Sequence, residues 1–451
     1  MSFQPKRCVD LESRIHETHE NIKFIQKKIM AININTIREQ FPALAITDEG
    51  KARVYLDNPG GTQVPRQVLE RMERYLIYTN ANHGGPFRTS IESDLVLEEA
   101  HRAMADLLNA KFADEIVFGA NMTSLTFAVS RSIGRLFKRG DTILLTRMDH
   151  DGNVGPWLHL AEDLGLKVRW LNFDLKTYEY NLDEAAALLK DGAVKLAAIN
   201  YASNCLGTIN DVKTITKLAH QSDTLVFVDA VQYVPHGPTD VQYIGCDFLV
   251  CSPYKFFGPH QGVLWGKAEL LSSLEAYKVR PADNTAPGKF ETGTQLHEGQ
   301  AGTLGVLEYL EWIGKTMATE FQANFPDFSG RRKYLHAAML AVQDYEQTLS
   351  KRLISGLQNL PGVDVKGISN QNEFSRRVPT VSFTVKNQNP EEIAQKLAEE
   401  NIFTWHGHNY ALEAIRQMDL EKSGGVIRIG PVHYNTIAEI DHTLGVLKTC
   451  W

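Results

Sequence analysis

A regular alternation of short apolar runs and helix-length amphipathic stretches constrains the fold of this chain more than any other feature of its sequence. The runs contain β-branched residues and little polar alternation, which is typical of strands buried on both faces. They occupy residues 116–118, 143–145, 168–171, 196–199, 225–228 and 248–250. Helices are expected between them over residues 95–110, 121–137, 183–190 and 211–220. This order predicts an α/β fold with a mostly parallel sheet, whose ligands bind at the carboxyl ends of the strands.

A different rhythm begins after residue 302. The pattern there predicts a long helical stretch over 303–357, strands near 363–366, 379–385, 402–405 and 426–430, and a helix over 390–400. Such an order is typical of an α+β arrangement. The 451 residues are about three times the usual domain length of about 150. We therefore predict a large domain over residues 51–300 and a smaller C-terminal domain over 310–451.

Two segments precede the large domain. Residues 31–50 are predicted to pack with the small domain, and residues 1–30 to form an N-terminal extension. Residues 10–29 carry apolar side chains at helical spacing, which predicts an amphipathic helix. Two alternatives stay open for this helix: an accessory arm, or an upstream extension of the reading frame with Met30 as the true start.

Composition and charge narrow the class of protein. Hydrophobic residues make up 43% and charged residues 22%, as in a globular protein with a sizeable core. The formal charge of −7 argues against nucleic acid or an anionic membrane as the main partner. The five cysteines form no CxxC pair, and no apolar stretch approaches the ~18 to 20 residues that cross a bilayer. We therefore expect a cytoplasmic protein.

A carboxylate and an amine follow two of the predicted strands. Asp229 ends the run at 225–228, where a helix cap and a ligand contact are equally good interpretations. Lys255 comes 26 residues later, just after the run at 248–250. Together the two residues suit pyridoxal phosphate (PLP), because the amine forms a Schiff base with the aldehyde and the carboxylate pairs with the pyridinium nitrogen.

Four further segments fit the same cofactor. Residues 119–124 join a strand to a helix, where backbone N–H groups and a threonine hydroxyl can hold a phosphate, although alone this is more often a helix cap. His150 follows the run at 143–145 and offers an imidazole that can stack on a ring and move protons. Residues 201–207 supply an amide, and residues 290–294 form a glycine-containing turn with two hydroxyls.

In their order and spacing these segments resemble the class V aminotransferase family of fold type I PLP enzymes, and most of all its cysteine desulfurase and selenocysteine lyase branch. The match runs from Tyr55-Leu56-Asp57-Asn58 to Arg428 and Tyr434-Asn435-Thr436. The resemblance implies a fold type I architecture: a large domain with a mostly parallel seven-stranded sheet and a smaller α+β C-terminal domain. It also implies PLP as cofactor, a small amino acid as substrate and an obligate homodimer.

The resemblance also assigns roles to individual residues. Lys255 resembles the Schiff-base lysine and His150 the histidine stacked on the ring, and both are expected to be catalytic. The implied cofactor contacts are Asp229 at the pyridinium nitrogen, Asn204 and Gln232 beside the phenolic oxygen, Thr123 with Met122 in the same turn and Ser252 at the phosphate, and Thr294 at the phosphate of a neighbouring subunit. Arg428 resembles the arginine that holds the substrate α-carboxylate. The other residues expected on the substrate side are Asn58, His83, His408 and Tyr410.

The chain departs from the desulfurase pattern at the loop whose cysteine attacks the substrate sulfur. Tyr410 stands at that position, and no cysteine lies between Cys251 and Cys450. A phenol cannot carry a persulfide. Cys205 is better interpreted as a buried structural thiol. His406 and His408, with His433 in the same predicted domain, are expected to be hydrogen-bond donors to substrate, so no metal site is predicted.

These observations predict a PLP-dependent enzyme that cleaves the C–S bond of L-cysteine or a related amino acid without the usual loop cysteine. Two alternatives stay open. One is transamination or epimerisation of another amino acid, as in the isopenicillin N epimerase-like members, which also lack that cysteine. The other is a non-enzymatic scaffold that keeps the fold. The complete set of Lys255, Asp229, His150 and Arg428 argues against the scaffold.

Overall fold

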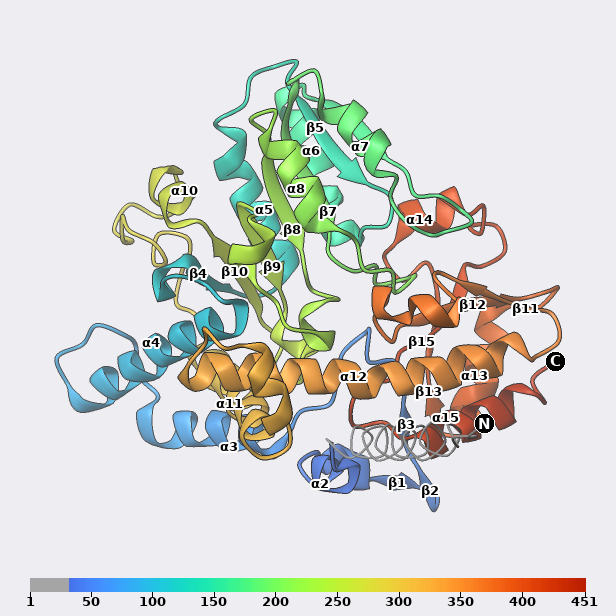
Figure 1. Cartoon of the computed structure of the whole chain (residues 1–451). Helices are drawn as coiled ribbons and strands as arrows, with labels where there is room; N and C mark the ends of the chain where they lie inside the picture. Colours follow the sequence, from blue (N-terminus) through green and yellow to red (C-terminus); the bar gives the residue numbers. More distant parts are fainter. Residues whose placement is uncertain (1–31) are drawn as a thin grey trace, which may run out of the picture.

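The computed structural model describes residues 32–451, and a seven-stranded sheet forms its centre (Figure 1). The spatial order of the strands is β4-β10-β9-β8-β7-β5-β6. The strands β9, β8, β7, β5 and β6 are parallel to one another, whereas β10 is antiparallel to both of its neighbours, β9 and β4. The strand bounds are β4 Ile116–Gly119, β5 Thr142–Thr146, β6 Lys167–Leu171, β7 Val194–Asn200, β8 Leu225–Asp229, β9 Phe248–Cys251 and β10 Gly262–Gly266.

The expected α/β fold with a mostly parallel sheet is confirmed, and the six predicted runs become β4 to β9. The sequence pattern missed β10. Its three apolar residues lie between Gly262 and Gly266, and so short a run carries little periodicity.

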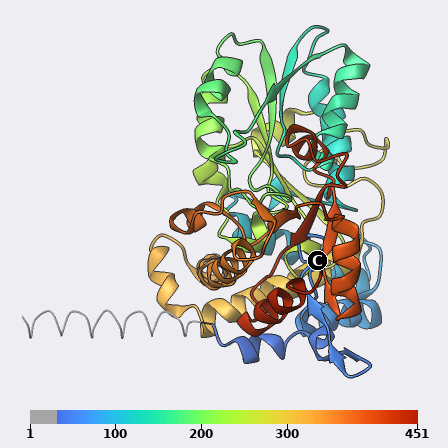
Figure 2. The same cartoon turned by 90° about the vertical axis from the view of Figure 1, so that its right-hand side faces the viewer.

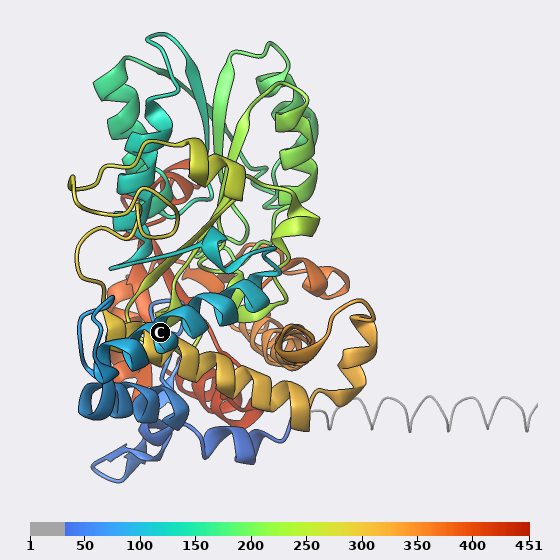
Figure 3. The ribbon, with the colours of Figure 1, turned by 90° about the vertical axis from the view of Figure 1, so that its left-hand side faces the viewer.

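Helices cover both faces of this sheet, as Figures 2 and 3 show from two sides. On one face lie α5 (Met122–Gly134) and α6 (Gly155–Leu164), and on the other α7 (Leu182–Leu189) and α8 (Val212–His220). Side-chain caps fix where α5, α7 and α8 begin, and at α5 Asn121 Oδ1 accepts a hydrogen bond from Ser124 N at 2.8 Å.

A further layer of helices lies beyond the end of the sheet (Figure 1). It contains α3 (Arg66–Arg74), α4 (Arg88–Leu108), α11 (His297–Thr316) and α12 (Gly330–Gln358). The predicted helical stretch over 303–357 is therefore two helices, separated by residues 317–329 with the 3-10 segment η7 (Thr319–Asn324). Helix α12 packs on α4 and α11 and then continues to the second sheet.

The second sheet is antiparallel, with the order β11-β12-β15-β14. Its strands are β11 (Val363–Lys366), β12 (Val381–Val385), β15 (Val426–Ile429) and β14 (Trp405–Gly407), and its helices are α13 (Pro390–Glu399), α14 (Leu412–Gln417) and α15 (Ile437–Leu447). Near the start of the chain, β3 (Val54–Tyr55) pairs in parallel with β13 (Ile402–Phe403). The exact domain bounds stay a prediction.

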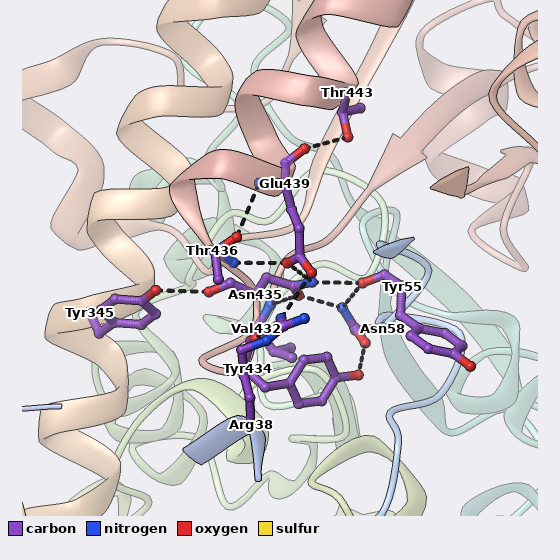
Figure 4. A network of polar contacts seen from close by, with 10 residues as sticks. All are labelled: Arg38, Tyr55, Asn58, Tyr345, Val432, Tyr434, Asn435, Thr436, Glu439 and Thr443. Carbon is purple, nitrogen blue, oxygen red and sulfur yellow. Dashed lines mark hydrogen bonds and ion pairs between the residues drawn. The ribbon is translucent and has the colours of Figure 1, made fainter. Parts of the chain in front are cut away.

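A polar network ties the start of the described chain to α12 and α15 (Figure 4). Arg38, which ends α2 (Ile34–Arg38), donates to Tyr434 O at 2.7 Å and to Glu439 Oε1 at 2.9 Å. Glu439 also closes a capping box with Thr436 at the start of α15. Tyr345 of α12 donates to Asn435 O at 2.8 Å, so three distant segments share one cluster of hydrogen bonds.

The amphipathic helix expected over residues 10–29 lies outside the described residues. Across residues 32–451, none of the helices combines the length and the apolar character that a bilayer crossing requires.

The close approach of β10 to the start of α5 requires glycine at position 262. A Cβ atom there would clash with backbone atoms of Asn121 and Met122. We expect Gly262→Ala to lower the free energy of unfolding by about 1–3 kcal/mol, since backbone must move to accept the methyl group. Gly445→Ala is the matched control, because a Cβ atom on this α15 residue meets nothing within 4 Å. Urea unfolding of both variants checks the prediction, and equal stabilities would contradict it.

Candidate active site

A cavity of about 490 Å³ opens where β7, β8 and β9 end, beside the start of α5 and beneath β14 and β15 of the second sheet. Ten of the residues expected in the site line this cavity, from both halves of the chain. They are Met122, Thr123, His150, Asn204, Asp229, Gln232, Ser252, Lys255, Tyr410 and Arg428.

Burial lowers the pKa of Lys255 and raises the pKa of Asp229. Removal from water and the charge of nearby Arg428 together lower the pKa of the Lys255 amine to about 7, although the charges of Asp57 and Asp229 oppose this shift. Burial raises the pKa of the Asp229 carboxyl to about 7, against a hydrogen bond from Val231 N at 2.9 Å and the charge of Lys255. The amine is therefore substantially neutral and nucleophilic at neutral pH.

His150 is held as a neutral imidazole. Burial, with the charges of Lys255 and Arg428, lowers its pKa to about 3. Its Nδ1 accepts a hydrogen bond from Gly152 N at 2.9 Å, so the ring proton sits on Nε2. Behind it, burial and the charge of Asp229 raise the pKa of Asp149 well above its ordinary value.

The start of α5 lines the part of the cavity that is suited to a phosphate group. Thr123 lies in the first turn, where backbone N–H groups and the helix dipole favour an anion. A Cβ atom on Gly152 would meet Thr123 Oγ1 at 3.0 Å and the Sδ atom of Met122 at 3.3 Å, so this glycine keeps the cradle open. Ser252, which follows β9, is buried and also lines the cavity.

The two predicted amides lie on the cavity wall but are already engaged. Asn204 Nδ2 donates to Asn409 O at 2.7 Å, and the buried Asn204 Oδ1 has no hydrogen-bond partner among the described residues. Gln232 Nε2 donates to Thr380 Oγ1 at 2.8 Å.

Arg428 of β15 enters the cavity from the second sheet. Its Nη1 donates to Asn204 O at 3.2 Å, and its Nη2 forms an ion pair with Asp57 Oδ1 at 3.0 Å. Its Nε is buried and has no hydrogen-bond partner among residues 32–451. A buried donor without a partner is rare in folded proteins, so this edge of the guanidinium is suited to an anionic ligand.

The segment after β14 closes one side of the cavity. Asn409 and Tyr410 both adopt left-handed backbone conformations, with φ of 52° and 56°. The Tyr410 carbonyl accepts from Asp151 N at 2.6 Å, and its ring stacks on His150 with centroids 5.4 Å apart. The Tyr410 side chain remains 66% exposed, so the phenol lies at the mouth of the cavity.

Four of the expected residues lie away from this cavity. Asn58 is buried, donates to Gly430 O at 2.7 Å and to Asn435 Oδ1 at 3.2 Å, and belongs to the network of Figure 4. His83, His408 and Thr294 are exposed. Their roles toward a substrate or a neighbouring subunit stay predictions.

The sequence analysis did not assign site roles to several residues that line the cavity. Asp57 is the most informative, because neighbouring Asn58 was chosen from the same motif. Asp57 forms a parallel bridge with Gly430, and consecutive residues of extended backbone point to opposite sides. The alternating direction of side chains along an extended segment is the sequence signal that distinguishes Asp57 from Asn58. The others are Pro59, Gly60, Asn121, Asn200, Ala202, Val231, Tyr254, Trp405 and Asn409.

The cysteine and histidine side chains of Cys205 and His433 lie outside the cavity and are buried. Cys205 is fully buried, and burial raises its pKa to about 11. His433 is buried and its Nε2 lies 2.6 Å from Tyr309 Oη. Among residues 32–451, no three His, Cys, Asp or Glu side chains gather in a way that could hold a metal ion.

The sequence pattern of the family described as Aminotransferase class-V matches residues 54–326 and 330–443. The chain belongs to the class V aminotransferase family. Among its relatives, this chain is 30% identical to the aminotransferase-like protein FGM3 of Gibberella zeae, over 93% of its own length and 98% of that protein. It is also 30% identical to a cysteine desulfurase of Synechococcus elongatus, over 93% of its own length and 64% of that longer protein.

Solved structures agree with this family. A cysteine desulfurase from Thermococcus onnurineus NA1 superposes with a TM-score of 0.79 at 27% identity, covering 92% of this chain and 97% of that one. The cysteine desulfurase CsdA from Escherichia coli shares the fold, with a TM-score of 0.76 at 23% identity over 93% of this chain and 98% of that one. The expected fold type I architecture and the desulfurase-like branch are thereby confirmed.

The residues present fit PLP, the cofactor of this family. A desolvated carboxylate, Asp229, suits a cationic ring nitrogen, and a nucleophilic amine, Lys255, suits an aldehyde. The start of α5 suits a phosphate. Neutral His150 offers a flat ring beside them.

The lowered pKa of Lys255 gives a direct test on the protein without cofactor. Only the neutral amine reacts with acetic anhydride, so labelling of Lys255 should rise as the pH increases through about 7. In the urea-unfolded chain, the same lysine should follow the ordinary value of 10.5. Mass spectrometry of the Lys255 peptide across pH 5 to 11 reports both curves. Coincident curves would contradict the prediction.

Proposed function

We propose that this class V aminotransferase is a PLP-dependent enzyme that cleaves the C–S bond of L-cysteine or a closely related amino acid. One observation carries the proposal: Lys255, Asp229, His150 and Arg428 line a single cavity of about 490 Å³. The similarity to cysteine desulfurases supports the choice of reaction.

Lys255 is the residue that we assign to covalent attachment of PLP and to removal of the substrate Cα proton. Both tasks need a neutral amine, and burial supplies one by lowering the Lys255 pKa to about 7. PLP bound at this lysine would supply an electron sink for the electron pair left on Cα. Asp229 would keep the ring nitrogen charged, because a buried carboxylate is stabilised by an adjacent cation.

Arg428 is assigned to the substrate α-carboxylate. Its buried Nε without a described partner lies in the cavity wall, and a guanidinium edge binds a carboxylate through two parallel hydrogen bonds. The contact between Arg428 Nη1 and Asn204 O, at 3.2 Å, holds the guanidinium in place. His150, neutral at physiological pH, can donate from Nε2 to a leaving group, because its Nδ1 accepts from Gly152 N.

The fate of the sulfur follows from the absence of a thiol in the cavity wall of residues 32–451. Without a cysteine at position 410, the described cavity wall offers no thiol on which a persulfide could form. Two balanced outcomes remain. L-cysteine and water give pyruvate, ammonia and hydrogen sulfide, or L-cysteine and an external thiol give alanine and the persulfide of that thiol.

The proposed reaction is tested by incubating the PLP-loaded protein with L-cysteine and dithiothreitol and measuring pyruvate, alanine and sulfide. We expect one of the two carbon products together with sulfide, and no product from Lys255→Ala. Formation of neither product would overturn the proposal. Transamination or epimerisation of another amino acid, which the similarity to an aminotransferase-like protein favours, would then take its place.

We also propose a homodimer in which Thr294 of the partner subunit contacts the cofactor phosphate. Exposed apolar side chains gather on the π-helical turn η2 (Tyr75–Thr79) and on α4 with its preceding residue, as expected of an association surface. The segment of Thr294 lies beside them, because His297 Nδ1 is 3.0 Å from Tyr75 Oη. The exposed residues are Leu76, Ile77, Tyr78, Phe87, Ile91 and Leu95.

The dimer is tested by Ile91→Glu, which places a charge in the proposed interface. We expect the variant to sediment as a monomer and to bind PLP more weakly than the unchanged protein. Leu175→Glu is the matched control, since Leu175 and Ile91 are both 51% exposed but Leu175 follows β6. A monomeric unchanged protein, or equal effects of the two substitutions, would contradict the proposal.

We place the enzyme in a reducing compartment, the cytoplasm. The described cysteines Cys205, Cys246, Cys251 and Cys450 are all free and buried. Proteins of oxidising compartments more often pair their cysteines.

A further inference from the structure

The carboxylate of Asp57 occupies one corner of the guanidinium that faces the cavity. Asp57 Oδ1 lies 3.0 Å from Arg428 Nη2. Both residues line the cavity, and the side chains of Arg428 and Asp57 are 5% and 26% exposed. The ion pair is therefore part of the wall that a ligand meets.

The contact engages only half of the guanidinium edge. Elsewhere in this chain, Asp48 binds the same edge of Arg53 with both oxygens, at 2.6 Å from Nε and 2.7 Å from Nη2. On Arg428, Asp57 takes Nη2 alone, and the buried Nε has no described partner. An incoming carboxylate that binds both nitrogens needs the position that Asp57 Oδ1 holds.

The backbone fixes where the Asp57 carboxylate lies. Gly60 N and Gly61 N donate to Asp57 O at 2.9 and 3.3 Å, which closes a tight turn beneath the side chain. A Cβ atom on Gly60 would clash with Asp57 Oδ2. Asp57 also forms a parallel bridge with Gly430, two residues beyond Arg428. The Asp57 backbone is thus anchored beside Arg428, and the side chain is the part that a ligand can displace.

We propose that Asp57 is a resident carboxylate that a ligand carboxylate must replace on Arg428, and that it thereby selects amino acids over simple carboxylates. The proposal rests on the carboxylate-binding role proposed for Arg428. A simple carboxylate has to displace Asp57 with no other favourable contact. An amino acid also carries an amine that binds in the site, and this second contact offsets the cost of displacing Asp57 from Arg428. Asp57 therefore acts as a specificity-determining residue.

The test measures binding of propionate, a carboxylate without an amine, by calorimetry on the PLP-loaded protein. Asp57→Asn keeps an oxygen that can accept from Arg428 but removes the competing charge. We expect its dissociation constant for propionate to fall by about fivefold or more. Arg428→Gln should abolish binding at this site. Asp441→Asn is the matched control, because it removes a carboxylate from an exposed Asp–Arg pair, 2.5 Å from Arg352, and should change nothing.

Any of three results would overturn the proposal. These are propionate binding by Asp57→Asn that is equal to or weaker than that of the unchanged protein, no propionate binding by any of these proteins, and binding that survives Arg428→Gln.

A crystal structure of the unchanged protein with propionate gives a second test that needs no variant. We expect the propionate oxygens on Arg428 Nε and Nη2 and Asp57 displaced. An intact Asp57–Arg428 pair beside bound propionate would contradict this. Because propionate binding does not depend on turnover, failure of C–S cleavage and failure of this proposal are distinguishable.

Discussion

The free-energy cost of burying charged side chains at the ends of the parallel strands determines the properties of the site. Asp229 and Lys255 leave adjacent strands inside the protein, so their side chains lose water together. Burial disfavours the charged form of both, and it moves an acid and a base toward the same pKa of about 7. The arrangement around them, with a helix start on one side and a guanidinium on the other, makes sense as the surroundings of a ligand that carries charges of both signs.

The same cavity is also where the two halves of the chain are fastened together. Arg377 is buried without an acidic partner among the residues described, and its side chain instead donates to the carbonyl oxygens of Leu206, Ile368, Val378 and Thr380. Burial lowers its pKa to about 9. These bonds join the turn that carries Asn204 to the second sheet, and Asn204 in turn supports Arg428. The position of Arg428 in the cavity wall therefore depends on this interface.

The sequence predicted most of the sheet and of the cofactor side of the site, because strand ends and helix starts carry local signals. The strand before Asp229 and the strand before Lys255 were both located by unbroken apolar runs. β10 was missed because glycines shorten its pattern. The break after α11 does have a sequence signal, since Asn324, Pro326 and Gly330 interrupt the helical pattern. Alternation along the extended segment distinguishes Asp57 from Asn58, but the partner of Asp57, Arg428, lies 371 residues away, and a local pattern does not identify it.

The segment after β14 is attached to the cavity by its backbone. The Asn409 carbonyl accepts from Asn204 Nδ2 at 2.7 Å and the Tyr410 carbonyl from Asp151 N at 2.6 Å, and a peptide carbonyl is the same in every residue. The side chain at position 410 contributes to neither bond and points to the cavity mouth. A change of side chain at position 410 therefore leaves both of these anchoring hydrogen bonds intact, so the loop can keep its place while the chemistry presented at the cavity mouth changes.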